Sequence, residues 1–250
     1  SRSTNQVYYS CVYKRKPCLH NIYLNTAAAG IVSDKTLSTC VQYLDAEQNV
    51  GAYVAQYMQE PDLNSLGPMA ARLLSCHSDE IAFADSGTRA WHKALESVGL
   101  KQGDSVLVSP GVWGGHYFTL LQFERLLGIN IKPMPQLADG SIDLDRLADF
   151  FDPTVKMVEL CHAPSGWDSW QSLEPVITLA NHHGIPVLVD ACQSMGQRLF
   201  NVGELGCDML VCSGRKWLCG PRGTGLLFAR ENWCRKRSPL YLGQHQATLV

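Results

Sequence analysis

Short apolar runs alternate with helical segments along most of the chain, and this alternation constrains the fold more than any other feature. Strand-like runs occupy 104–110 (DSVLVSP), 155–164 (VKMVELCHAP), 185–193 (IPVLVDACQ) and 207–214 (CDMLVCSG). Helical periodicity lies between them and before them, as in 88–100, where Trp91, Leu95 and Val98 recur on one helix face. Alternation with short connections predicts an α/β fold with a mostly parallel sheet, covered by helices on both faces.

Composition excludes several classes of protein. The chain has 250 residues, 46% hydrophobic and 18% charged, which is typical of a soluble globular protein. A formal net charge of -2 gives no electrostatic reason to expect nucleic acid or a membrane as a partner. The 10 cysteines include no CxxC pair and follow no apolar signal segment, so we expect reduced thiols in a cytoplasmic protein. No His or Cys spacing resembles a metal site.

Three polar groups follow strand-like runs, where open α/β sheets bind ligands. Gly87 and Thr88 begin a helix, and free backbone N–H groups there attract an anion. Asp190 ends an apolar run, where an ionised carboxylate needs a cation or a strong donor; a structural salt bridge is the alternative. Lys216 follows the next run. In this order, the three groups could bind the phosphate, the pyridinium nitrogen and the aldehyde of pyridoxal phosphate. Together they therefore fit this cofactor.

Five segments together resemble one family. YLNTAAAG, DSGTRAW, HAPSG, VDACQSMGQ and SGRKWLCGPRGTGLLFAR, spread from about Tyr23 to Arg230, are similar to the class V aminotransferase and cysteine desulfurase family. The resemblance implies the three-layer large domain of the fold type I pyridoxal phosphate enzymes. It also implies an N-terminal arm and helical segment (1–60), the cofactor domain (61–240) and the start of a connection (241–250) toward a small C-terminal domain, which we expect to be absent.

The resemblance also implies roles around the cofactor. Lys216 would form the Schiff base with pyridoxal phosphate and then move the Cα proton, and Asp190 would keep the ring nitrogen protonated. Gln193 would hydrogen-bond near the ring hydroxyl. Gly87, Thr88 and Ser213 would bind the phosphate. Trp113 would stack on the ring, although a core tryptophan is an equally good interpretation.

Substrate residues follow from the same resemblance. Asn25 and Ala28 lie in the segment that approaches the substrate carboxylate, and Ser165 lies at a substrate-side position. Relatives usually bind that carboxylate through an arginine beyond the end of this chain, so we expect an incomplete substrate site. Arg222 is the alternative carboxylate partner, because its guanidinium suits bidentate binding.

The function expected is that of an enzyme that forms an external aldimine with an amino acid and removes its Cα proton. Arg215 stands where desulfurases have a histidine, which favours the epimerase-like and C–S lyase-like members. C–S cleavage of a thioether or sulfoxide amino acid is therefore the first alternative, and desulfuration through a catalytic cysteine ranks third. A catalytically silent homologue, serving as a binding or dimer partner, is the alternative of another class. The family also implies a homodimer.

Overall fold

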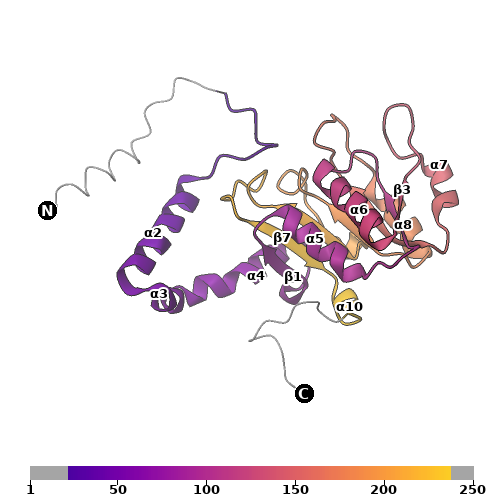
Figure 1. Ribbon diagram of the computed structural model, residues 1–250. Coiled ribbons are helices and arrows are strands. Elements are labelled where there is room, and N and C mark those ends of the chain that lie inside the picture. Colours follow the sequence, from indigo (N-terminus) through magenta and orange to yellow (C-terminus); the bar gives the residue numbers. More distant parts are fainter. Residues whose placement is uncertain (1–21, 238–250) are drawn as a thin grey trace, which may run out of the picture.

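A seven-stranded sheet forms the centre of the protein in the computed structural model, which describes residues 22–237 (Figure 1). The strand order is β1-β7-β6-β5-β4-β2-β3. Strands β2 to β6 pair in parallel, whereas β7 runs antiparallel to both of its neighbours. The predicted mostly parallel α/β sheet is thereby confirmed. The strands are β1 (Ile81–Ala84), β2 (Ser105–Val108), β3 (Asn130–Pro133), β4 (Val155–Cys161), β5 (Val187–Asp190), β6 (Met209–Ser213) and β7 (Gly225–Ala229).

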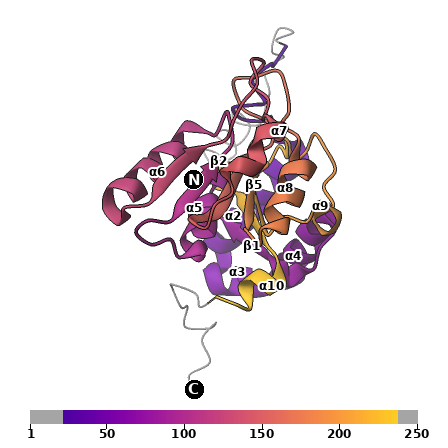
Figure 2. The ribbon, with the colours of Figure 1, turned by 90° about the vertical axis from the view of Figure 1, so that its right-hand side faces the viewer.

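Helices cover both faces of the sheet, which makes the three layers expected for the fold (Figure 2). One face packs against α5 (Gly87–Val98) and α6 (Gly114–Leu127), with α10 (Glu231–Cys234) at its edge. The other face packs against α7 (Leu144–Leu147), α8 (Leu173–His182) and α9 (Val202–Leu205). Two short 3-10 turns, η1 (Ser78–Glu80) and η2 (Ala148–Phe150), join elements of these layers.

The N-terminal helices form an arm that extends away from the sheet (Figure 1). The arm consists of α2 (Asp34–Val50), α3 (Ala52–Met58) and α4 (Glu60–Leu74), and only the end of α4 reaches the core. The predicted helical segment of the arm is interrupted at Gly51, whose φ of 84° is incompatible with continued helix. The predicted boundary near residue 60 falls at the start of α4 and stays a prediction.

Helix α5 shows how the sequence positions the site. The Ser86 hydroxyl accepts a hydrogen bond from the Arg89 backbone N–H at 3.1 Å, which caps the start of the helix, and Gly99 ends it in the left-handed conformation. Trp91, Leu95 and Val98 are buried, as their spacing predicts. Their packing fixes the first turn of α5 against the sheet.

The predictions for residues 1–20 and 241–250 lie outside the described residues. Within 22–237, no helix combines the length and the apolar character needed to cross a bilayer.

Candidate active site

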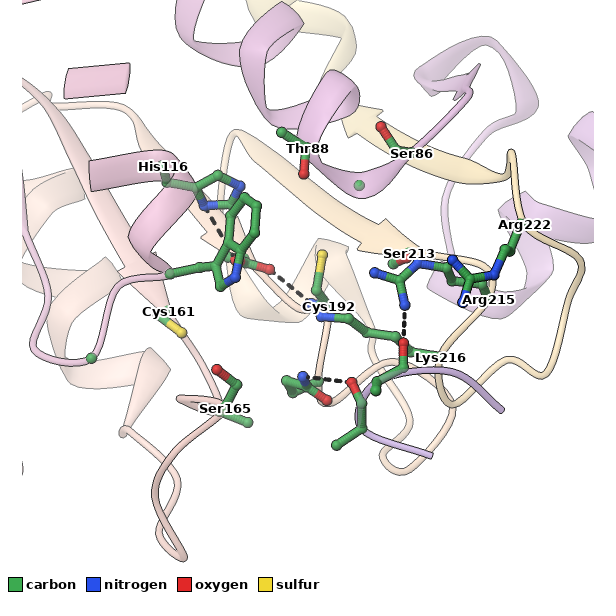
Figure 3. A pocket seen from close by; sticks show the side chains of 18 residues that line it. Ser86, Thr88, His116, Cys161, Ser165, Cys192, Ser213, Arg215, Lys216 and Arg222 are labelled. Carbon is green, nitrogen blue, oxygen red and sulfur yellow. Dashed lines mark hydrogen bonds and ion pairs between the residues drawn. The ribbon is translucent and has the colours of Figure 1, made fainter. Parts of the chain in front are cut away.

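A cavity of about 460 Å³ opens beyond the carboxyl ends of β4, β5 and β6 (Figure 3). Such a volume suits a small organic ligand. Every site residue predicted from the sequence lines it, with the exception of Asn25. The lining predicted from the sequence consists of Ala28, Gly87, Thr88, Trp113, Ser165, Asp190, Gln193, Ser213, Lys216 and Arg222.

The first turn of α5 forms one wall of the cavity. The backbone N–H groups of Gly87 and Thr88 belong to the opening turn of the helix, which leaves them without carbonyl partners inside it. A Cβ at Gly87 would lie 2.7 Å from the Cys192 sulfur, so glycine permits the helix start to pack directly on the segment after β5. Ser213, at the end of β6, adds a hydroxyl to the same wall. This wall can bind an anion.

A carboxylate and an amine face the same space. Asp190 ends β5 and is 5% exposed, and its Oδ1 accepts a hydrogen bond from the Cys192 backbone N–H at 2.8 Å. Lys216 lies in the turn after β6, and its side chain extends toward Cys192 (Figure 3). The pKa of the Cys192 thiol is raised, first by burial and next by the charge of Asp190, while the Lys216 ammonium opposes the rise. The two charged groups predicted to share a crevice therefore do so.

The segment 25–30, which we call the N-terminal strap, crosses the turn that carries Lys216. The Ala28 carbonyl accepts a hydrogen bond from the Arg215 guanidinium. The Gly30 N–H donates to the Arg215 carbonyl at 2.7 Å, and the Ala27 carbonyl accepts from the Gln193 amide at 3.0 Å. A Cβ at Gly30 would lie 2.3 Å from the Lys216 carbonyl oxygen, so only glycine permits this approach. The strap brings Ala28 to the cavity.

Asn25 begins the strap but does not line the cavity. It is exposed, and its backbone carbonyl accepts hydrogen bonds from Ala28 and Ala29, both at 3.0 Å, which close a turn. Gln193 lines the cavity with both ends of its amide engaged, because its Oε1 accepts a 2.8 Å hydrogen bond from the Trp217 indole. The predicted contact of Gln193 with a ring hydroxyl stays a prediction.

Trp113 and Ser165 lie on the wall opposite Lys216, and Arg222 lies at the exposed rim. The Trp113 ring packs against the backbone of Gly115, where a Cβ would lie 2.0 Å from a ring carbon. Trp113 is 44% exposed and is therefore not a core tryptophan. Its ring is available to a ligand in the cavity.

Two residues of this region escaped the sequence analysis. His116, on the first turn of α6, lines the cavity and lies 3.4 Å from Asp190, measured from Nδ1 to Oδ2. Glu159, on β4, is fully buried behind both. An acidic residue inside the apolar run 155–161 was the available signal for Glu159. A single histidine in a helix offered none.

Comparison with known proteins identifies similar sequences over most of the chain. The profile of the family Aminotransferase class-V matches residues 22–250. A probable cysteine desulfurase of Methanothermobacter thermautotrophicus is 26% identical over 228 residues, which cover 89% of this chain and 56% of the relative. A cysteine desulfurase of Escherichia coli is 29% identical over 168 residues, 65% of this chain and 40% of the relative. The chain thus spans about half the length of the curated relatives it matches.

Solved structures share the fold. The cysteine desulfurase CsdA from Escherichia coli superimposes with a TM-score of 0.79 at 21% identity, over 90% of this chain and 58% of that one. The cystine C–S lyase C-DES, in complex with its product cysteine persulfide, gives a TM-score of 0.78 at 22% identity, over 87% of this chain and 59% of the other. At these identities, the likeness shows the fold alone.

Proposed function

Because the chain belongs to the Aminotransferase class-V family, we propose that it is a pyridoxal phosphate enzyme that acts at the Cα of an amino acid. The observation that carries the proposal is the convergence of Lys216, Asp190 and the start of α5 on one cavity. Each group could bind one part of the cofactor, and none of them alone would support the proposal.

The residues present fit the cofactor. Its phosphate would lie on the N–H groups of Gly87 and Thr88 with the Ser213 hydroxyl, where the helix start favours negative charge. Its ring nitrogen would face Asp190, whose second carboxylate oxygen is not used by Cys192. Lys216 would hold the aldehyde carbon of the cofactor covalently through Nζ, with the aldehyde oxygen lost as water.

The cofactor, when bound, supplies an electron sink for the carbanion that forms at the substrate Cα. The Asp190 carboxylate would hold a proton on the ring nitrogen. Lys216 Nζ would first hold the cofactor covalently and, once displaced by a substrate amine, would take the Cα proton. Trp113 would restrict the ring to one plane and exclude water from that side.

We propose that the substrate carboxylate approaches the rim formed by the N-terminal strap. Ala28 borders the cavity there, Ser165 lines the wall opposite Lys216, and Arg222 offers a planar cation beside Arg215 (Figure 3). Arg215 is held by the Ala28 carbonyl, so Arg222 is the better carboxylate partner of the two.

C–S cleavage of a sulfur-containing amino acid is the second candidate. The curated relatives named above are cysteine desulfurases, which supports a sulfur substrate. A persulfide carried by the cavity cysteines is not supported, because burial raises the pKa of both Cys161 and Cys192 and keeps them as unreactive thiols. The sulfur would then leave with the product fragment.

Product analysis tests the two candidates. Pyruvate, ammonia and a sulfur fragment from a sulfur amino acid would establish C–S cleavage. A keto acid together with aminated cofactor would establish transamination. A purified protein that stays colourless with pyridoxal phosphate, and shows no borohydride-reducible adduct, would instead indicate a silent homologue and end the proposal.

A homodimer in the cytoplasm completes the proposal. Apolar side chains on the arm are exposed, including Leu44, Tyr53 and Tyr57, and a second copy could cover them. The cysteines described by the structure are free thiols, which supports a reducing compartment. Light scattering during size exclusion gives the mass, and Tyr53→Glu with Tyr57→Glu should reduce it to that of one chain. A single-chain mass for the unmodified protein would contradict the homodimer.

A further inference from the structure

Three buried polar side chains meet behind the cavity. His116, Glu159 and Asp190 offer nitrogen and oxygen atoms that all lie within 4.8 Å of one another. His116 Nδ1 is 3.4 Å from Asp190 Oδ2 and 4.0 Å from Glu159 Oε1. The side chains of His116 and Glu159 are 2% and 0% exposed. The dashed line that starts at His116 in Figure 3 marks its ion-pair contact with Asp190.

The carboxyl oxygens of Asp190 and Glu159 lie within 4.8 Å of each other, so a charge on one group disfavours a charge on the other. Asp190 has the surroundings of an anion, because the Cys192 N–H binds one oxygen and the Lys216 ammonium faces the same cavity. Glu159 faces no cation: its Oε2 accepts from the Ser109 hydroxyl at 3.3 Å, and its Oε1 has no hydrogen-bond partner. Burial and the charge of Asp190 raise the pKa of Glu159 well above its usual value. Glu159 is therefore the neutral acid of the pair.

His116 is neutral too, because burial lowers its pKa to about 4, against the opposing charge of Asp190. Its ring is held in place by stacking on Trp91, with centroids 4.2 Å apart and an angle of 6° between the planes. Nδ1 therefore faces Asp190 in a fixed orientation. A nitrogen lone pair turned to a carboxylate would be repelled, whereas Nδ1–H would donate to it, so the site selects the tautomer protonated at Nδ1.

We propose that His116 and Glu159 are positioning residues, a neutral pair that keeps the Asp190 carboxylate ionised and aimed into the cavity. His116 Nδ1 has no hydrogen-bond partner in the structure, and with a proton on it Nδ1–H would donate to Oδ2 of Asp190 across the 3.4 Å ion-pair contact. Glu159 keeps its own proton, which adds no second negative charge. The role in catalysis rests on the proposed function, since it is a bound pyridinium nitrogen that this carboxylate would face.

The first experiment uses cofactor-free protein and does not depend on the proposed function. Nitrogen-15 NMR of labelled histidine identifies the His116 signal by its loss in His116→Phe, and we expect a neutral ring protonated at Nδ1. Infrared difference spectra between the unmodified protein and Glu159→Gln should show the C=O band of one protonated carboxylic acid. A ring protonated at Nε2, or the absence of that band, would overturn the pair.

The second experiment follows the ring nitrogen of bound, nitrogen-15-labelled pyridoxal phosphate. His116→Phe keeps a ring for stacking on Trp91 but removes the donor, whereas His116→Asn loses the ring and keeps an amide N–H. We expect His116→Phe to shift the proton shared by the ring nitrogen and Asp190 toward Asp190 by about ten- to a hundredfold, the effect of one hydrogen bond to a charged group. At a fixed pH the nitrogen-15 signal then moves toward that of an unprotonated ring. His116→Asn should recover most of this shift.

Glu159→Gln is the matched control, because it replaces a neutral acid with a neutral amide of the same shape. It should leave the nitrogen-15 signal of the ring unchanged at that pH. A merely structural role for His116 predicts the reverse order, with His116→Phe tolerated and His116→Asn damaging, and that result would refute the proposal. A shift in Glu159→Gln as large as in His116→Phe would show that Glu159 is ionised and would refute it as well. Failure of the unmodified protein to bind the cofactor would refute the catalytic role and leave the cofactor-free results to decide the pair.

Discussion

Replacing His116 with asparagine should flatten the acid side of the protein's stability profile. The pKa of His116 falls from its ordinary value of 6.5 to about 4 in the folded protein, mainly because the ring is buried. As the pH falls below 6.5, His116 therefore takes up a proton in the unfolded chain but stays neutral in the folded chain. The stability contributed by the neutral ring is fully present above 6.5 and is lost as pH falls through about 4.

The magnitude follows from the width of that window. Each pH unit corresponds to about 1.4 kcal/mol for one proton. The interval between the pKa values of His116 in the unfolded and folded chain, 6.5 and about 4, therefore amounts to about 3 kcal/mol of unfolding free energy. Between about pH 7 and about pH 5, the free energy of unfolding should fall by about 2 kcal/mol more in the unmodified protein than in His116→Asn. Glu159 acts in the opposite direction, since the raised pKa of a carboxyl costs stability as pH rises, but it is present in both proteins.

Urea unfolding of the cofactor-free proteins at several pH values measures the difference. The constant cost of losing the stack on Trp91 drops out, because only the change with pH is compared. His182→Asn, at the exposed end of α8, is the control and should run parallel to the unmodified protein. Parallel profiles for His116→Asn as well would refute the buried, neutral state of His116.

Three further predictions concern the cofactor and its wall. Lys216→Ala should abolish the borohydride-reducible adduct, which intact-protein mass spectrometry detects as the mass of the cofactor; an adduct that survives would assign the bond to another lysine. Asp190→Asn should leave the cofactor bound while removing most turnover, and near-normal turnover would refute its role. Gly225→Ala places a Cβ 2.3 Å from the Ser86 carbonyl carbon, so it should cost about 1–3 kcal/mol in urea unfolding and weaken cofactor binding. Gly67→Ala, in α4 with only a 3.6 Å contact, should be neutral or stabilising; equal effects at both positions would contradict the packing argument.

The parallel part of the fold could be predicted because its signal is local. The buried strands β2, β4, β5 and β6 are short apolar runs, and the helix face of Trp91, Leu95 and Val98 follows from spacing alone. Strand β7 was not predicted from its pattern, since GLLFA follows a glycine-rich turn and is too short to show a period. Its antiparallel place between β1 and β6 depends on contacts between distant segments, which local pattern does not encode.

The residues of the candidate site were likewise predictable only in part. Asp190 and Lys216 were found because each follows an apolar run and because parallel strands bring their carboxyl ends together. His116 lies on α6, and its partners Glu159 and Asp190 lie on strands far from it in sequence. It was missed because nothing in the local sequence GGHYF indicates a functional histidine. Asn25 was matched to the family motif, but the turn that follows it carries Ala28, not Asn25, to the cavity.

The N-terminal strap has a consequence for the order in which the molecule assembles. Its hydrogen bonds to Gln193 and Arg215 join segments 166 and 187 residues apart in the chain. Contacts of such separation form after the local ones, because closing a long loop costs entropy that only a preformed surface repays. The cavity is therefore closed at its rim by a late step of folding. By the same reasoning, the strap can detach while the sheet stays intact, so the Gly30 amide should exchange its hydrogen with solvent much faster than the amides of β5.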